Sequence, residues 1–145
     1  VANVWRAARE RRADVEVYGA GVTRFHLDMP DWTAFVLSAI ADMRGGEIFT
    51  PRAPAWGLLE LAQAFTPNPA ILDPRLGDKQ HETLVSSDEA RRTVVTDWAH
   101  IVEPPDGLRA VWNYQGRDGA RLAGAYSSDV ARRMSAGELR ELWAR

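Results

Sequence analysis

The stretch MPDWTAFVLSAIADMRGG, residues 29–46, carries the clearest structural signal in the sequence. Its apolar side chains recur at three- and four-residue spacing, so in a helix they would lie on one face. These residues are Trp32, Phe35, Val36, Ala39, Ile40 and Met43. Asp28 or Met29 precedes this helix, Pro30 fits its first turn, and Gly45-Gly46 ends it. We expect the apolar face to lie in the core of the protein.

Shorter elements flank this helix on both sides. Upstream we expect an amphipathic helix from Val1 to Arg12, a strand over residues 15–18 and an extended segment over residues 22–28. Downstream we expect strands over residues 47–50, 70–72 and 94–102, the last with Trp98 inside it, and a loop over residues 104–107. The mixture, without regular alternation of strand and helix, predicts a small α+β domain.

Two further helices complete the prediction. One runs from about Trp56 to Phe65 and buries Leu58, Leu59, Ala62 and Phe65. The other follows the sequence Ser135-Ala136-Gly137-Glu138, which matches a capping box. Behind this box we expect an apolar face made of Leu139, Leu142 and Trp143.

The composition excludes several classes of protein. With 145 residues, 46% of them hydrophobic and six of them tryptophan, the chain can form one domain with a modest core. It has no cysteine, so disulfides and thiolate metal sites are excluded. The apolar runs are short, no secretory leader is recognisable, and the net charge is −2. We therefore expect a cytoplasmic protein without nucleic acid or membrane as partner.

The usual catalytic and cofactor motifs are missing. The turn Gly19-Ala20-Gly21 lacks the third glycine of a dinucleotide-binding loop, and Gly116, Gly119 and Gly124 have the wrong spacing. None of Tyr18, Tyr114 and Tyr126 is followed four residues later by lysine. The three histidines, His26, His81 and His100, do not share the spacing of metal ligands. We expect no metal and no NAD(P) in this chain, and we interpret Ser86, Ser87, Ser127 and Ser128 as caps and turn residues.

Three segments, in order, resemble one family. They are VYGAGVTRF at residues 17–25, GGEIFTP at residues 45–51, and RLGDKQHE at residues 75–82 followed by SDEAR at residues 87–91. Together with the tail from Tyr126 to Leu142, they are similar to the C-terminal, substrate-binding part of the polysaccharide-biosynthesis branch of extended short-chain dehydrogenases. That branch includes inverting UDP-N-acetylglucosamine 4,6-dehydratases and UDP-sugar epimerases. The sequence departs from the family pattern at Leu76, Asp78 and Gln80, where the family has Pro, Glu and Leu.

The resemblance implies a division of labour. The chain would be a single substrate-binding domain, with the nucleotide-sugar side in residues 1–70 and the Arg-x-Gly-Asp segment and tail in residues 71–145. Its relatives place NAD(P) and the catalytic tyrosine and lysine in an upstream Rossmann half, which this sequence does not contain. The chain would bind a UDP-sugar without being catalytically competent alone, and a separate Rossmann-domain partner would fit it. The alternatives are a stand-alone UDP-sugar-binding or regulatory module and a degenerate protein kept for oligomerisation.

The resemblance also assigns roles to residues. With 17 arginines and the single lysine Lys79, an arginine is weak evidence unless its position is known. By resemblance, Arg24 and Arg75 clamp the diphosphate, because a planar guanidinium donates two parallel hydrogen bonds. The alternative for each is a surface arginine or a structural ion pair. By resemblance, Asp78 accepts hydrogen bonds from the ribose hydroxyls. Alternatively, it is the N-cap of a helix over residues 79–82. Val17 and Tyr18 would meet the base through backbone groups, unless Val17 packs in the core.

Three roles stay open at this point. Lys79 either contacts the diphosphate or is solvated. His81 and Glu82 either orient the two arginines or hold the surrounding loop together. Without a Rossmann half to cover it, apolar surface around Val4 and Trp5 would be exposed, so we expect a homo-oligomer.

Overall fold

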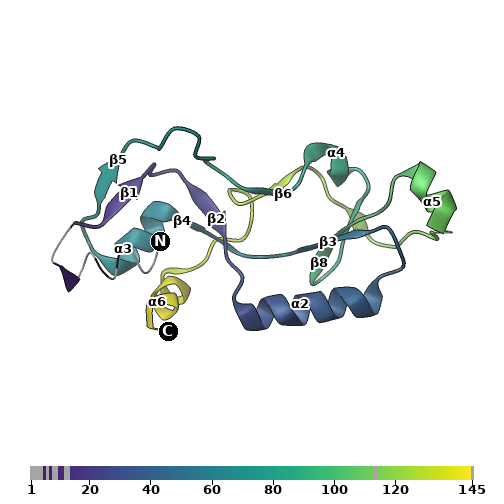
Figure 1. Ribbon diagram of the computed structural model, residues 1–145, viewed down its shortest axis with the longest axis horizontal. Helices are drawn as coiled ribbons and strands as arrows, with labels where there is room; N and C mark the ends of the chain where they lie inside the picture. Colours follow the sequence, from purple (N-terminus) through teal and green to yellow (C-terminus); the bar gives the residue numbers. More distant parts are fainter. Residues whose placement is uncertain (1–4, 6, 8–9, 12–13, 113, 145) are drawn as a thin grey trace. The chain divides into compact units, whose positions relative to one another are not determined.

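The computed structural model describes residues 5, 7, 10–11, 14–112 and 114–144 (Figure 1). Contacts divide the chain into two compact units. Unit 1 comprises Val1–His26, Pro54–Glu82 and Arg132–Arg145, and unit 2 comprises Leu27–Ala53 and Thr83–Ala131. Each unit therefore combines residues from both sides of position 70. Both units mix short strands with helices, which confirms the predicted α+β class.

The described part of unit 1 includes two pairs of strands and the helices α3 and α6. Strand β1 (Glu16–Tyr18) pairs in parallel with β5 (Ala70–Leu72), and β2 (Thr23–Phe25) pairs antiparallel with β4 (Ala55–Gly57). Helix α3 (Leu58–Phe65) packs against α6 (Ala136–Ala144) and against β1. These elements enclose an apolar core formed by Trp5, Val15, Val17, Leu61, Ala62, Met134 and Leu139.

Helices α3 and α6 begin where local hydrogen bonds satisfy free backbone amides. The Glu60 carboxylate accepts a hydrogen bond from the Gly57 amide at 3.1 Å, at the start of α3. At α6, the Ser135 amide donates to the Glu138 carboxylate at 2.7 Å, and the Glu138 amide donates to the Ser135 hydroxyl at 3.3 Å. The predicted capping box is thus confirmed, and Leu139 behind it is buried. The side chains of Phe65 and Trp143 lie outside those described.

Unit 2 is built on an antiparallel four-stranded sheet with the strand order β3-β8-β7-β9. These strands are β3 (Ile48–Pro51), β7 (Thr93–Val95), β8 (Ala99–Val102) and β9 (Ala120–Arg121). A second pair joins β6 (Thr83–Val85) to β10 (Tyr126–Ser127). The helices are α2 (Met29–Asp42), α4 (Ser87–Ala90) and α5 (Asp106–Trp112). Ser86 caps α4 by accepting the Glu89 amide, as expected of a cap serine.

Three predicted element types were wrong. Residues 94–102 form a hairpin instead of one strand, because Thr96 bonds to both the amide and the carbonyl of Ala99 and turns the chain at Trp98. Residues 104–107 are not a plain loop, since Pro105 accepts the first helical hydrogen bonds and α5 begins at Asp106. Trp56 belongs to strand β4, where it faces Arg24 across the β2–β4 pair, and helix α3 starts two residues later.

Helix α2 forms as predicted but is not buried as predicted. Its N-cap is Asp28, which accepts the Asp31 amide at 3.0 Å, and Pro30 lies in the first turn. No residue of α2 is buried, and Leu37 and Ile40 are 62% and 60% exposed. Within the described part of unit 2, Phe35 links the helix to the Trp98 turn, with ring centroids 5.7 Å apart. The spacing of apolar residues in the sequence predicts that the helix has an apolar face, but it does not predict whether another part of the protein covers that face.

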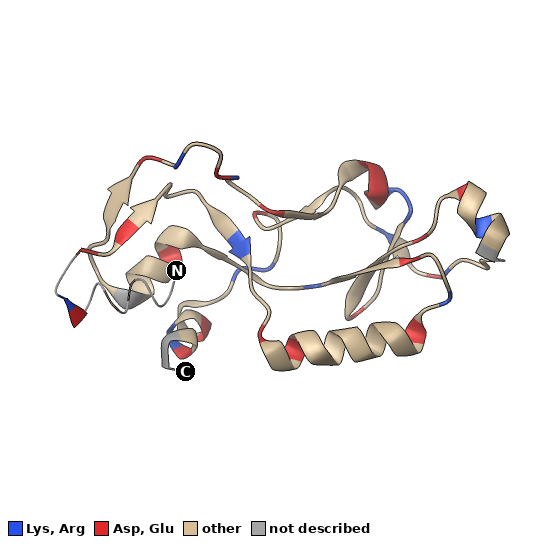
Figure 2. Cartoon of the chain, in the orientation of Figure 1, with Lys and Arg blue, Asp and Glu red and all other residues tan. Residues whose placement is uncertain are grey.

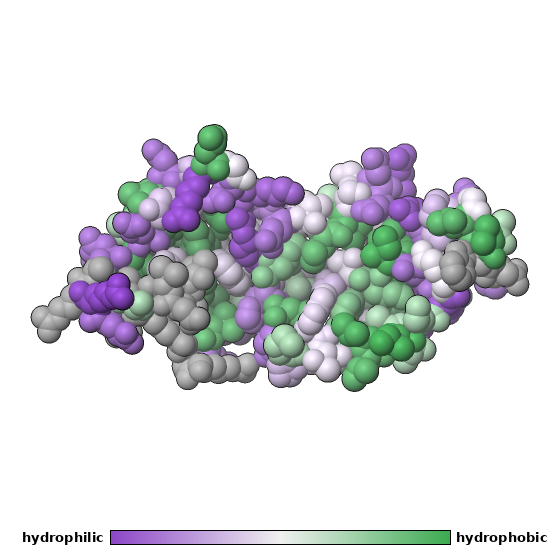
Figure 3. Space-filling view, in the orientation of Figure 1, coloured by the Kyte–Doolittle hydropathy of each residue, from purple (hydrophilic) through white to green (hydrophobic). Residues whose placement is uncertain are grey.

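The surface views locate this exposed face. Figure 2 shows α2 without a charged residue between Asp31 and Asp42. Figure 3 shows apolar side chains gathered over part of the same helix. No described helix has both the length and the apolar character needed to span a bilayer.

The N-terminal prediction is only partly described. The expected helix from Val1 to Arg12 lies mostly outside the described residues, as does Val4. Trp5 is described and is 5% exposed, with its indole nitrogen donating to the Glu16 carbonyl at 3.1 Å. The expectation that Trp5 forms an exposed apolar patch was therefore wrong, because the indole packs into the core of unit 1.

Candidate functional site

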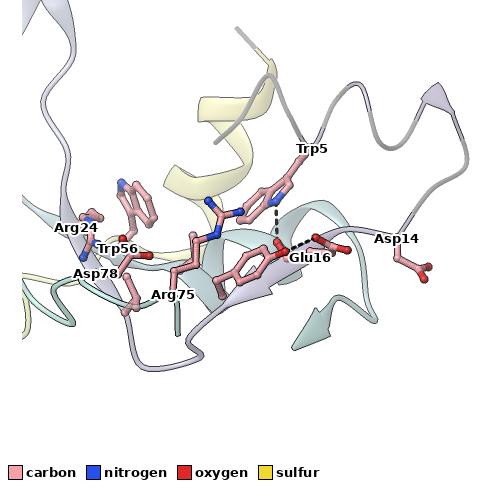
Figure 4. Close-up of a pocket in the computed structure, with 10 residues that line it drawn as sticks. Trp5, Asp14, Glu16, Arg24, Trp56, Arg75 and Asp78 are labelled. Atoms are coloured by element: carbon pink, nitrogen blue, oxygen red, sulfur yellow. Dashed lines mark hydrogen bonds between the residues drawn. The ribbon is translucent and has the colours of Figure 1, made fainter. Parts of the chain in front are cut away.

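A pocket of about 510 Å³ opens in unit 1 (Figure 4). It is lined by residues from the N-terminal segment, the β1–β2 region, strand β4, the start of α3 and the loop after β5: Trp5, Asp14, Glu16, Tyr18, Val22, Arg24, Trp56, Leu58, Arg75 and Asp78. Four of these residues, Tyr18, Arg24, Arg75 and Asp78, are ones that the sequence resemblance singles out. The fold thus brings them to one cavity from positions up to 60 residues apart.

Arg24 lies on β2 and is held by several acceptors. Its guanidinium donates to the Thr23 carbonyl at 2.7 Å and to the Gln80 carbonyl at 3.4 Å. Its Nε lies 3.5 Å from the Glu82 carboxylate. Glu82 also accepts the Phe25 amide at 3.3 Å, so one carboxylate is anchored to the strand and to the arginine. These contacts restrict the direction in which Arg24 points.

His81 supports the same strand from the same loop. Its Nδ1 lies 2.8 Å from the Thr23 hydroxyl, and the Thr23 amide donates to the Gln80 carbonyl at 2.9 Å. His81 does not line the pocket, while the neighbouring Glu82 contacts Arg24 directly. Of the two roles considered for this pair, the geometry gives Glu82 contact with an arginine and gives His81 the attachment of the loop to β2.

Arg75 is presented by a turn that follows β5. The Asp78 amide donates to the Arg75 carbonyl at 3.1 Å, and Gly77 adopts a φ of +88°. The guanidinium carbon of Arg75 lies 4.0 Å from the centre of the Tyr18 ring, within the range of a cation–π contact. Across this turn, a Cβ on Gly19 would lie 2.9 Å from Val22 and 3.3 Å from Pro74, so glycine permits the close approach of the two loops.

The other predicted residues occupy three different places. Asp78 lines the pocket, and no helix begins there, so the interpretation as a helix cap was wrong. Val17 is fully buried in the core of unit 1, where it pairs with Ile71. Lys79 is exposed and does not line the pocket.

Several lining residues were missed by sequence reasoning. Glu16 could have been found, because Val15 and Val17 are buried and alternation along β1 turns Glu16 and Tyr18 to the other side. Glu16 also accepts the Tyr18 hydroxyl at 2.8 Å. For Trp5 and Trp56, no local signal exists, since their place in the pocket depends on contacts with distant segments.

The lining chemistry is mixed. Two guanidinium groups can bind an anion, the carboxylates of Asp14, Glu16 and Asp78 can accept hydrogen bonds from hydroxyl groups, and aromatic rings offer flat apolar surface. Such a set suits a ligand that combines a planar ring, hydroxyls and negative charge. The described residues contain no cluster of three potential metal ligands.

The Gly19–Gly21 turn is not built like a dinucleotide-binding turn. In a dinucleotide-binding site, a glycine turn leads from a strand into a helix whose N-terminus faces the pyrophosphate. Here the Gly19–Gly21 turn joins strand β1 to strand β2. A Cβ on Gly21 would lie 2.8 Å from the Gln80 side chain, so that side chain occupies the space in front of the turn.

Several known proteins are similar to this chain in sequence. Residues 1–104 match the family model described as polysaccharide biosynthesis protein. The chain is 34% identical over 97 residues to an inverting UDP-N-acetylglucosamine 4,6-dehydratase of Campylobacter jejuni, an alignment that covers 66% of this chain and 29% of that protein. It is 30% identical over 131 residues to a UDP-glucose 4-epimerase of Rickettsia canadensis, covering 83% of this chain and 38% of that protein.

A solved structure shares the fold. The X-ray structure of Pen from Bacillus thuringiensis superposes with a TM-score of 0.77 at 22% identity, covering 98% of this chain and 43% of that one. The chain thus spans well under half the length of these relatives. The match to the family model covers most of the chain and confirms the resemblance carried by the three sequence motifs. The chain belongs to the polysaccharide biosynthesis protein family.

Proposed function

We propose that this chain is the UDP-sugar-binding portion of a dehydratase or epimerase of polysaccharide biosynthesis. The observation that supports the proposal is the convergence of Arg24, Arg75, Asp78 and Tyr18 on one pocket. Relatives that match the chain are named as enzymes acting on UDP-N-acetylglucosamine or UDP-glucose. A degenerate copy kept only for oligomerisation would have no reason to keep these four side chains together.

Each group in the pocket has a role in the proposal. Arg24 and Arg75 bind the diphosphate, because guanidinium groups form charge-assisted, paired hydrogen bonds to phosphate oxygens. Asp78 accepts hydrogen bonds from the ribose hydroxyls. Tyr18 meets the base, and Glu82 keeps Arg24 directed at the phosphates through their 3.5 Å contact. Lys79 contributes only long-range charge, because it is exposed outside the pocket.

We propose that this chain binds the UDP-sugar but does not by itself catalyse the reaction. In the complete enzyme, a bound nicotinamide would supply the oxidation of the sugar at C4 on which elimination or epimerisation depends. The nicotinamide and the base would belong to a Rossmann portion, either elsewhere in the polypeptide or in a separate partner. We propose that residues 1–145 by themselves bind no NAD(P). A stand-alone UDP-sugar sensor, which needs the same pocket, is the alternative.

Calorimetric titration with UDP and uridine tests the proposal. UDP should bind more tightly than uridine, because only UDP carries the diphosphate. A charge-assisted hydrogen bond contributes about 1.5–3 kcal/mol, so Arg24→Ala and Arg75→Ala should each weaken UDP binding about ten- to a hundredfold. Lysine at either position should restore only part of the affinity, since an ammonium group cannot form the paired contact.

The matched control is Arg91→Ala. Arg91 is an exposed arginine of unit 2 whose carboxylate partner, Asp88, is also exposed. It tests whether UDP responds to the loss of any positive charge. The proposal would be refuted by equal affinity for UDP and uridine. It would also be refuted if neither Arg24→Ala nor Arg75→Ala changed the affinity for UDP.

A further inference from the structure

The two pocket arginines are held in different ways. Arg24 has two backbone carbonyls and the Glu82 carboxylate around its guanidinium. Among the described residues, Arg75 has no carboxylate within ion-pair distance, and its guanidinium rests on the Tyr18 ring. A cation held only by a ring face can leave it at small cost, because such contacts are weak at exposed sites. Arg24 is therefore fixed, whereas Arg75 is free to move.

The Tyr18 ring that carries Arg75 is itself fixed. Its hydroxyl donates to the Glu16 carboxylate at 2.8 Å, and Glu16 is tied by its carbonyl to the Trp5 indole at 3.1 Å. Strand β1 adds the pairing of Tyr18 with Leu72 of β5. The planar guanidinium thus covers one face of a well-anchored ring inside the pocket.

We propose that Arg75 and the ligand's planar base exchange places on the Tyr18 ring. This inference rests on the proposed function of the pocket. In the free chain Arg75 occupies the ring face, and on binding, the base stacks there while Arg75 turns to the diphosphate. Tyr18 is then a positioning residue for Arg75 as well as a stacking surface for the base.

The exchange couples recognition of the base to recognition of the phosphates. UDP replaces the contact between guanidinium and ring with a base–ring contact, and it offers Arg75 a stronger, doubly charged partner. Uridine displaces Arg75 in the same way but offers it no anion in return. A nucleoside alone therefore binds more weakly. The pocket thus selects ligands that carry both a planar base and a diphosphate.

This mechanism predicts opposite signs for one substitution. Arg75→Ala removes the group that competes with the base, so uridine should bind about two- to fivefold more tightly, which corresponds to the strength of an exposed cation–π contact. The same variant should weaken UDP. Arg24→Ala should weaken UDP too, but it should leave uridine within about twofold of wild type, because Arg24 does not cover the ring.

Affinities in the millimolar range are measurable by NMR titration with uridine and UDP, with Arg91→Ala as the control. Tighter uridine binding by Arg75→Ala supports the exchange. Unchanged or weaker uridine binding by that variant overturns it, while UDP binding that still needs both arginines leaves the proposed function intact. If UDP ignores both arginines, the proposed function fails first and the exchange with it.

A second measurement follows Arg75 directly. Protons above an aromatic ring resonate upfield, so the side-chain signals of Arg75 in the free chain should be shifted upfield, and Arg75→Lys identifies them by their disappearance. Saturating UDP should move them to ordinary arginine positions, and Tyr18→Leu should do so without ligand. Signals that are not shifted in the free chain, or that stay shifted with UDP bound, would contradict the exchange.

Discussion

Arginine serves different ends in the two units of this molecule. In unit 2, Arg117 is 7% exposed on its side chain and donates to Asp42 and Glu47, each at 2.7 Å. Its backbone amide donates to Glu103, whose side chain is fully buried and also accepts from Arg109 and Arg121. In the described part of unit 1, Arg75 meets a ring face and no carboxylate. The arginines of this unit 2 network are neutralised by carboxylates and stabilise the fold, whereas Arg75 has no carboxylate partner among the described residues and is available to a ligand.

The pKa values of two carboxylates in unit 2, Glu103 and Glu47, reflect the same pairing with arginine. Burial works to raise the pKa of Glu103, but hydrogen bonds from Arg121 and the Arg117 amide outweigh it and hold the pKa below its ordinary value. For Glu47, burial is likewise outweighed, by hydrogen bonds from the Arg44 amide and Arg117, and its pKa is also lowered. Both groups therefore stay charged and paired in the folded protein at neutral pH.

The units differ again in their apolar residues. Unit 1 encloses Trp5, Val17 and Leu139 in one core. Unit 2 leaves the longest helix of the described chain with no buried residue. Among the described residues, α2 therefore carries a run of exposed apolar side chains, whereas Trp5 itself is buried.

The largest expected effect is on the charge network of unit 2. Arg117→Ala should lower the free energy of unfolding by about 3–5 kcal/mol, because it leaves the buried Glu47 carboxylate without its charged partner and also breaks the pair with the partly exposed Asp42. Urea denaturation followed by tryptophan fluorescence measures this loss. Arg91→Ala, which breaks an exposed pair, should change stability by no more than about 0.5 kcal/mol. A loss below about 1 kcal/mol for Arg117→Ala would mean that the network is not what holds unit 2.

The next prediction concerns the exposed face of α2. We expect self-association through this face, so Leu37→Lys combined with Ile40→Lys should weaken it at least about tenfold, since each substitution removes apolar area and adds charge. Sedimentation over a range of concentrations measures the association constant. Val130→Lys, at an exposed apolar residue outside α2, is the matched control. A wild-type chain that stays monomeric at high micromolar concentration would refute the prediction.

The smallest effect is a dependence of stability on pH. Burial, with Arg52 nearby, lowers the pKa of His100 below 6.5, and its Nδ1 has no hydrogen-bond partner among the described residues. Below pH 6.5 the unfolded chain therefore takes up a proton that the folded chain resists. Stability should fall as the pH falls from 6.5 toward the folded pKa, and it should level off below that pKa.

The variant His100→Phe isolates this contribution. It keeps a ring beside Tyr126, which His100 meets edge-on with centroids 4.3 Å apart, and removes the titrating group. Urea midpoints measured at about pH 7.5, 6.5 and 5.5 should fall less steeply for the variant than for wild type. Parallel curves for the two proteins would show that His100 does not contribute.

Local features of the fold were predictable from the sequence. Asp28 and Pro30 start α2, and Ser135 with Glu138 starts α6, because these side chains satisfy amides within three residues of themselves. Strand β5 was also found at residues 70–72. The sequence motifs identified the family, and four residues that they singled out line one pocket.

Features that depend on distant segments were not predictable. The spacing of apolar residues correctly predicted a helix with an apolar face at α2. Whether that face is buried depends on segments that are distant in the sequence. The turn at Trp98 is closed by one Thr96 hydroxyl, inside a run that reads as a continuous strand. Trp5 and Trp56 reach the pocket only because β1, β4 and the N-terminal segment pack together.

By itself, the sequence determined the caps, the family and the set of candidate binding residues. Only the tertiary structure decided how each arginine is used, because 17 arginines look alike in sequence and differ in their neighbours. Arg117 pairs with the buried Glu47 carboxylate, Arg24 is held by Glu82, and Arg75 rests on a tyrosine ring. The energy of a charge depends on its burial and its partners, and long-range packing supplies both.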